Sequence, residues 1–137
     1  MFKHIMVPID LHMPPEVKKA TEVAAQLAKW QDAKVTIVTV TGPQPGDSKL
    51  TTDAIAKELQ TFASEIAMQS GTQVDTRNIH SVDVAVEVDR DLTRTAEEIG
   101  ADLIVVGTHA PRITDYILSS HAGYLAKHAS MSVFVVR

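Results

Sequence analysis

The feature that most constrains this chain is a series of short apolar runs. They occupy residues 5–9, 35–40, 103–106 and 132–136. Apolar residues fill both faces of most of these runs, a pattern typical of strands covered by helices on each side, as in a parallel sheet. A weaker, alternating stretch at 74–81 predicts a fifth strand nearer to a sheet edge.

Amphipathic helices are predicted between these strands. Apolar residues recur at steps of three or four along 17–28, 55–66, 88–99 and 118–129, which places them on one face of a helix. The resulting β-α-β-α-β-α-β-α-β order predicts an α/β fold, a doubly wound and Rossmann-like parallel sheet with helices on both faces. Residues 1–137 then form a single domain of ordinary size.

Three details of the connections refine this plan. Gly71 and Gly100 fit helix ends. Segment 42–53 holds two prolines and two glycines and is therefore predicted to be a surface loop. The stretch 82–92, "VDVAVEVDRDL", is ambiguous, because it either extends the third strand or enters the next helix early.

Composition narrows the classes of function. The chain has no cysteine, which excludes disulfides and thiol chemistry. Its six histidines show neither His-x3-His nor HExxH spacing, so we expect no metal site in the protein itself. A net charge of −4 without a dense basic cluster argues against nucleic acid or an anionic membrane as the main partner.

The chain also shows no sign of export or membrane insertion. No apolar run approaches the ~20 residues of a membrane span. The N-terminus reaches Pro8 and Asp10 too early for a signal peptide. We therefore expect a cytoplasmic protein.

Candidate functional residues follow from the predicted topology. In open α/β sheets, ligands bind beyond the carboxyl ends of the strands, where the strand order reverses. Pro8, Ile9 and Asp10 follow the first strand, Val40 ends the second, and Gly107 follows the fourth. The stretch after the fourth strand, "GTHAPRITDYILSS" (107–120), occupies the place of a phosphate-binding loop but contains a single glycine.

Four segments of this chain match a known family in the right order. They are "HIMVPID" (4–10), "KVTIVTV" (34–40), "ADLIVVGTH" (101–109) and "LAKHASMSVFVVR" (125–137). On these segments the chain resembles the universal stress protein family over nearly its whole length. The resemblance implies a five-stranded parallel sheet of order 3-2-1-4-5 that binds ATP or another adenine nucleotide. The run "THAPRITDYIL" (108–118) resembles one branch, in which this loop carries a histidine and a proline.

The loop departs from the motif Gly-x2-Gly-x9-Gly-Ser/Thr of the ATP-binding members. Gly107 matches the first glycine, Ala110 stands at the second, and Ser119 and Ser120 best match the final pair with one residue fewer between. A Cβ at a position that needs positive φ costs roughly 1–2 kcal/mol. Backbone N–H groups and the Ser120 hydroxyl remain as donors. The loop is therefore either a weakened phosphate site or a surface turned to another task.

Each of the following candidate residues has two interpretations, one functional and one structural. Asp10 either hydrogen-bonds to ribose or adenine, or caps the segment that follows it. Val40 either lies beside adenine, as the resemblance implies, or is plain core. Arg112 and His109 contact phosphate or another ligand group, or they face water. Mg²⁺ could accompany a bound triphosphate through its phosphate oxygens.

The last strand suggests a partner. Residues 132–136 are predicted to form an apolar sheet edge, which is an aggregation hazard unless it is covered. Pairing with a second copy across a two-fold axis would cover it, and the resemblance implies the same homodimer.

Three functions remain open from the sequence. The first is a nucleotide-binding regulatory module that acts as a homodimer in stress response, with at most slow ATP hydrolysis, since no catalytic constellation or P-loop lysine is present. The second is a non-nucleotide interaction protein of the same fold. The third is an adenine-nucleotide hydrolase or ligase, against which the short chain counts.

Overall fold

A computed structural model describes residues 1–10, 15–42, 52–108 and 121–137 of the chain. Its centre is a five-stranded parallel sheet of order β3-β2-β1-β4-β5, which confirms the predicted order. The strands are β1 (His4–Pro8), β2 (Lys34–Thr41), β3 (Val74–His80), β4 (Leu103–Gly107) and β5 (Ser132–Val136).

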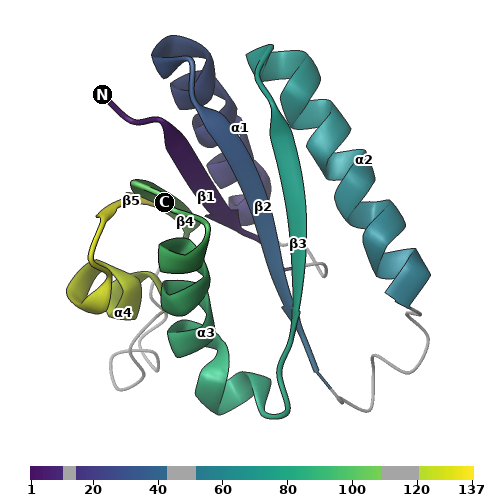
Figure 1. The fold of residues 1–137 in the computed structure, drawn as a ribbon, viewed down its shortest axis with the longest axis vertical. Coiled ribbons are helices and arrows are strands. Elements are labelled where there is room, and N and C mark those ends of the chain that lie inside the picture. The colour runs from purple at the N-terminus through teal and green to yellow at the C-terminus, as the bar shows by residue number, and fades with distance from the viewer. Residues whose placement is uncertain (11–14, 43–51, 109–120) are drawn as a thin grey trace.

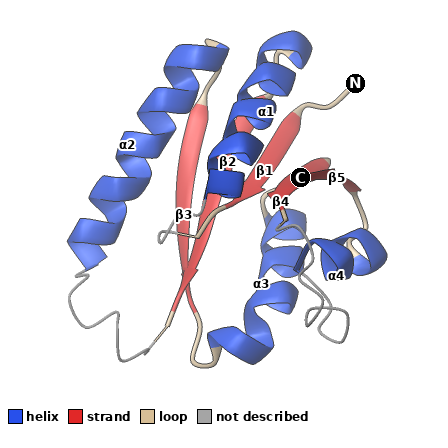
Figure 2. Cartoon of the chain, turned by 180° about the vertical axis from the view of Figure 1, so that it is seen from behind, coloured by secondary structure: helices blue, strands red, loops and turns tan. Residues whose placement is uncertain are grey.

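Helices cover both faces of this sheet (Figures 1 and 2). Two of them, α1 (Pro15–Gln31) and α2 (Thr52–Ser70), pack on one face. The other two, α3 (Val84–Glu98) and α4 (His121–His128), pack on the opposite face. The sheet is therefore doubly wound, as the alternation of apolar runs and amphipathic stretches predicts.

Side-chain alternation along the central strands divides the core into two clusters. In β1, Ile5 and Val7 are fully buried beneath α1 and α2, whereas Met6 between them is fully buried against α3 and α4. Burying one such side chain contributes roughly 1.5–3 kcal/mol. Because a shift of one residue in register would exchange the two faces, the pairing of the inner strands is strongly specified.

Helix boundaries agree with the glycine signals. Gly71 and Gly100 have φ values of 69° and 68°, and each follows the end of a helix. Glycine adopts this left-handed conformation without the steric cost that a Cβ adds. The ambiguous stretch 82–92 also resolves, because β3 ends at His80 and α3 already begins at Val84.

Polar contacts tie the strands together at their N-terminal ends. The Asp102 carboxylate accepts hydrogen bonds from the backbone N–H groups of Lys3 (2.8 Å) and His4 (3.0 Å). The His4 Nε2 atom lies 2.7 Å from Thr36 Oγ1. Burial and, to a smaller extent, the nearby Lys34 ammonium lower the pKa of His4 below its ordinary value of 6.5.

A charged pair lies at the same end of the sheet. Lys34 Nζ is 2.7 Å from the carboxylate of Asp75. The hydrogen bond from Lys34, with a second from Gln73, lowers the pKa of Asp75 below its ordinary value. Both perturbed groups, His4 and Asp75, thus lie at the starts of strands, opposite the edge where ligands bind in such sheets.

Acid should weaken the fold through His4. Since its pKa is lower in the folded state, the unfolded chain takes up a proton first as the pH falls below 6.5, and stability then declines toward the folded pKa. We expect urea unfolding at about pH 7.5 and about pH 5 to show a smaller acid-induced loss in His4→Gln than in the parent protein. The control is His80→Gln, an exposed histidine on β3. Equal losses in parent and His4→Gln would contradict this assignment.

Candidate functional site

The sheet opens at its carboxyl edge between β1 and β4. β1 pairs with β2 along its whole length, from His4 to Pro8. Its described pairing with β4 consists of Ile5 with Leu103 and Met6 with Ile104 only. The chain runs outward from β1 in both directions, so this is the topological switch point of the fold. Ligand-binding crevices form at such points.

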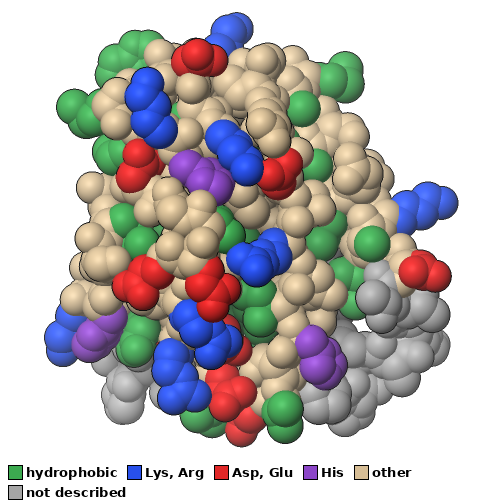
Figure 3. Space-filling view, viewed as in Figure 1, with side chains coloured by type: hydrophobic (Ala, Val, Ile, Leu, Met, Phe, Trp, Pro, Cys, Tyr) green, Lys and Arg blue, Asp and Glu red, His purple; other side chains and the backbone are tan. Residues whose placement is uncertain are grey.

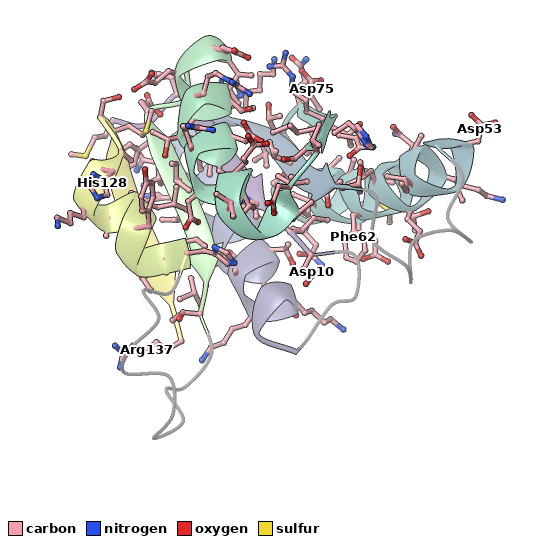
Figure 4. All side chains as sticks on the ribbon, turned by 90° about the horizontal axis from the view of Figure 1, so that it is seen from below. Asp10, Asp53, Phe62, Asp75, His128 and Arg137 are labelled. Carbon is pink, nitrogen blue, oxygen red and sulfur yellow. The ribbon has the colours of Figure 1, made fainter. Side chains whose placement is uncertain are left out.

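The exit of β1 supplies one side of the opening. Pro8 is half-buried and Ile9 is buried, and the Ile9 N–H donates to the carbonyl of Val38 at 2.8 Å. That bond keeps the chain paired with β2 for one residue past the end of β1. The side of the chain that faces β4 is left unpaired there. Asp10 follows and is exposed. Figure 4, which views the molecule from below, shows Asp10 beside α1, near the middle of the molecule.

β2 forms the rim next to this exit. Val40 is half-buried and packs on the cluster beneath α3 and α4, together with Val38 and Met6. The Thr41 hydroxyl donates to the side-chain oxygen of Asn78 on β3 at 3.0 Å. Val40 therefore belongs to the core and also lies at the carboxyl edge. A core role and a place beside adenine are thus compatible for this residue.

β4 and β5 supply the opposite side of the opening. Gly107 is half-buried at the end of β4 and lies in register with Val136. The next residue, Thr108, donates its N–H to the Val136 carbonyl at 2.9 Å. The chain thus leaves the sheet while still joined to β5. Lys19 of α1 donates to the backbone carbonyl of Arg137, which ties this side to the first helix.

Three of the predicted site positions, the exits of β1, β2 and β4, are therefore brought to one edge. The residues placed there are Pro8, Ile9, Asp10, Val40 and Gly107. The remaining predicted site residues lie outside the described part of the chain; they are His109, Ala110, Arg112, Ser119 and Ser120.

One rim contact was missed by sequence reasoning, which placed Gly42 in a surface loop. Gly42 is buried, and a Cβ added there would contact Val84 Cγ2 and lie 2.8 Å from the Ser81 carbonyl oxygen. The early start of α3 causes this, since it places Val84 on the end of β2. Only the presence of a glycine directly after a buried strand could have indicated the close approach.

Hydrogen bonds hold the start of α3 in place. The buried Ser81 hydroxyl donates to Glu87 Oε2 at 3.0 Å, and the Ser81 N–H donates to the Thr41 carbonyl at 2.8 Å. Val82 and Val86 beside them are exposed. Figure 3 shows apolar, acidic and basic side chains together at this lower end of the molecule.

Two classes of site find no support in the described residues. Within the four described ranges, no group of three or more histidine and acidic side chains could hold a metal ion. In the same part of the chain, no helix is long and apolar enough to cross a membrane.

Comparison with known proteins points to one family. The model of the "Universal stress protein family" matches residues 1–137. The chain is 30% identical over 146 residues to universal stress protein G of Salmonella typhimurium, and the match covers 100% of both chains.

Solved structures of the same family share the fold. A universal stress protein from Archaeoglobus fulgidus superposes with a TM-score of 0.76 at 21% identity and covers 100% of both chains. A universal stress protein in complex with cAMP gives a TM-score of 0.73 at 23% identity, over 99% of this chain and 97% of that one. A family protein from Arabidopsis thaliana with AMP bound gives 0.72 at 15% identity, over 98% and 90%.

Proposed function

The chain belongs to the universal stress protein family, and from this premise we propose that it binds an adenine nucleotide at the carboxyl edge of its sheet. The observation that carries the proposal is the separation of β1 from β4 beyond Met6 and Ile104. Fold relatives bound to cAMP and AMP support an adenine nucleotide as the class of ligand. Binding of ATP, with Mg²⁺ on its phosphates, is part of the proposal.

Each side of the opening has a role in this proposal. Asp10 accepts hydrogen bonds from ribose hydroxyls or adenine, while Pro8 and Ile9 fix the direction of the chain. Val40 offers an apolar contact to the base. Gly107 admits the phosphates close to the backbone. The rest of the phosphate site comes from His109, Ala110, Arg112, Ser119 and Ser120.

We propose a regulatory role for this binding, in the stress response and in the cytoplasm. The described residues contain no paired carboxylates or nucleophile–base pair at the open edge, so the protein would work by holding nucleotide and presenting a changed surface. The alternative is an interaction protein of the same fold that does not bind nucleotide. The glycine-poor loop favours that alternative, and direct binding measurements separate the two.

Removing the Asp10 carboxylate should weaken nucleotide binding. We expect Asp10→Ala to reduce affinity for AMP and ATP about tenfold or more, since hydrogen bonds to a charged group contribute roughly 1.5–3 kcal/mol. Isothermal titration calorimetry measures this loss. Asp53→Ala is the control, because Asp53 is an exposed acid in the first turn of α2, which Figure 4 shows far from Asp10. Equal affinities of parent and Asp10→Ala would remove Asp10 from the site.

The two edges of the sheet differ in a way that supports a homodimer through β5. Phe134 and Val135 on β5 are 46% and 37% exposed. The other edge, β3, carries the charged residues Asp75 and Arg77, and charge discourages pairing between edges. We propose that β5 (132–136) pairs with its copy in antiparallel fashion across a two-fold axis.

A charge on β5 should separate this dimer. Val135→Asp places a carboxylate in the proposed interface, where an unpaired buried charge is costly, so we expect monomers at concentrations where the parent protein is dimeric. Light scattering after size-exclusion chromatography gives the mass. The matched control, His80→Asp, adds a carboxylate to the opposite edge. A parent protein that is monomeric, or a Val135→Asp dimer, would contradict pairing through β5.

A further inference from the structure

A hydrogen-bonded pair of side chains joins the two helices on one face of the sheet. His121 Nδ1 lies 2.7 Å from Asp89 Oδ1. His121 is the first residue of α4, and Asp89 lies in the second turn of α3. α3 follows the end of β3 and α4 follows the end of β4, so both helices start on the side of the carboxyl edge. The pair therefore lies on the side of the molecule where the proposed nucleotide site opens.

The two side chains differ in exposure. The Asp89 side chain is 20% exposed and the His121 side chain is 64% exposed. The carboxylate thus holds one side of the imidazole ring, while most of the ring faces outward. Among the described residues no hydrogen-bond partner engages the other ring nitrogen, Nε2, which leaves that atom available to a ligand.

The pairing fixes where the protons of the ring reside. An ionised carboxylate only accepts hydrogen bonds, so Nδ1 carries the proton in the contact with Asp89. In the neutral ring, Nε2 is then an acceptor and cannot donate to an anionic oxygen. A second proton converts Nε2 into a donor and makes the ring cationic, while the Asp89 carboxylate remains beside it. Binding of an anion at Nε2 therefore requires uptake of one proton.

In the described parts of α3, α4 and β5, the other charged groups bond to other side chains or lie at the far end of α4. On α3, Arg90 bonds to Glu87 at 3.3 Å, and Arg94 bonds to Asp91 at 2.7 Å. β5, which also packs on α4, has no charged side chain within 132–136. On α4 itself, the basic residues Lys127 and His128 lie in the last turn, at the far end of the helix. Asp89 is thus the charged partner that the structure gives to His121.

We propose that Asp89 and His121 form a proton-linked contact for the phosphate of the bound nucleotide, with His121 donating from Nε2 and Asp89 positioning its ring. This inference rests on the proposed nucleotide-binding function. It gives the site a cationic donor that glycine-based loops do not need. It also makes affinity depend on pH, with tighter binding at lower pH, because the contact needs the second proton on the ring.

The test uses adenosine 3′,5′-cyclic monophosphate, because a phosphodiester keeps its single charge while a phosphomonoester titrates near pH ~6. Affinity of the full chain is measured by calorimetry between about pH 8 and about pH 6. We expect it to rise about tenfold, as a charge-assisted hydrogen bond forms. We also expect proton uptake, seen as a dependence of the binding heat on buffer ionisation.

Four comparisons make the result specific. His121→Gln and Asp89→Asn should bind more weakly at the lower pH and lose most of the pH dependence. His128→Gln, a second exposed histidine on α4 that stacks on Tyr124, should keep it. Adenosine, which lacks the phosphate, should bind without this pH dependence. Thermal melting of each variant separates a loss of folding from a loss of the contact.

The outcomes distinguish the two levels of the proposal. Binding of cyclic AMP with an affinity independent of pH overturns the proton-linked contact and leaves nucleotide binding intact. The same conclusion follows if His128→Gln removes the pH dependence while His121→Gln keeps it. Absence of binding of cyclic AMP, AMP and adenosine at every pH overturns both the contact and the proposed function.

Discussion

Replacing Leu125 by alanine should lower the free energy of unfolding by about 2–5 kcal/mol, the range found for such truncations in well-packed cores. Leu125 is fully buried, and it joins α4 to Ile104 and Val106 of β4. α4 has eight residues and buries only Leu125 and Ala122 within them. The helix therefore depends on this one large side chain for its position on the sheet.

Urea unfolding followed by circular dichroism measures the Leu125→Ala effect. Lys127→Ala is the control on the same helix, since the side chain is exposed and such surface changes usually stay within about 0.5 kcal/mol. Because α4 carries His121, nucleotide affinity should fall together with stability. A loss of stability below about 1 kcal/mol would show that α4 is held in another way.

The second large effect is expected at Gly42. Alanine there places a Cβ against Val84 Cγ2 and 2.8 Å from the Ser81 carbonyl oxygen. At Gly42 the restriction is one of space and not of backbone conformation. The described glycines with positive φ are Gly71 and Gly100. Overpacking of this kind costs typically 1–3 kcal/mol. Since the contact lies at the carboxyl edge, the start of α3 should shift and weaken nucleotide binding as well.

A double-mutant cycle tests this contact. Val84→Ala removes the side chain that the new Cβ would meet, while the Ser81 carbonyl stays in place. Gly42→Ala in the Val84→Ala background should therefore cost less than it does in the parent protein, without becoming neutral. Equal costs in the two backgrounds would show that Val84 does not press on Gly42.

Local patterns in the sequence were enough to predict most of the fold. The inner strands are buried on both faces, so their apolar runs stand out, and Gly71 and Gly100 mark helix ends. The strand order is a different matter. Right-handed crossovers limit the topologies, but the order 3-2-1-4-5 was supplied by resemblance to a family, because short apolar strands carry little information about their neighbours.

The site was less accessible to sequence reasoning. The exits of β1, β2 and β4 could be placed, since the carboxyl ends of parallel strands share one edge. Contacts between elements could not be predicted from the sequence. The contact of Gly42 with Val84 depends on where α3 starts, and the pair of Asp89 and His121 joins residues 32 positions apart. Neither leaves a periodic signal, because each arises from the packing of two complete elements.

The structure changes how the glycine-poor loop should be viewed. A phosphate site was expected to depend on the backbone of residues 107–120, in which two of three glycines are replaced. In the proposed site, other groups at this edge would take part, namely the Asp10 carboxylate for the nucleoside and the His121 imidazole for the phosphate. On this proposal, side chains outside the loop would offset the loss of glycine contacts, and a chain with a changed motif could still bind nucleotide.

Whether this protein holds an adenine nucleotide is the central question, and one measurement tests it most directly. Protein purified without added nucleotide is denatured, and the released small molecules are identified by mass spectrometry. AMP, and ATP with Mg²⁺, are then titrated by calorimetry into protein from which any nucleotide has been removed. We predict a retained adenine nucleotide, or an affinity in the micromolar range. No retained nucleotide, together with affinities no tighter than about millimolar, would contradict nucleotide binding and favour an interaction protein of the same fold.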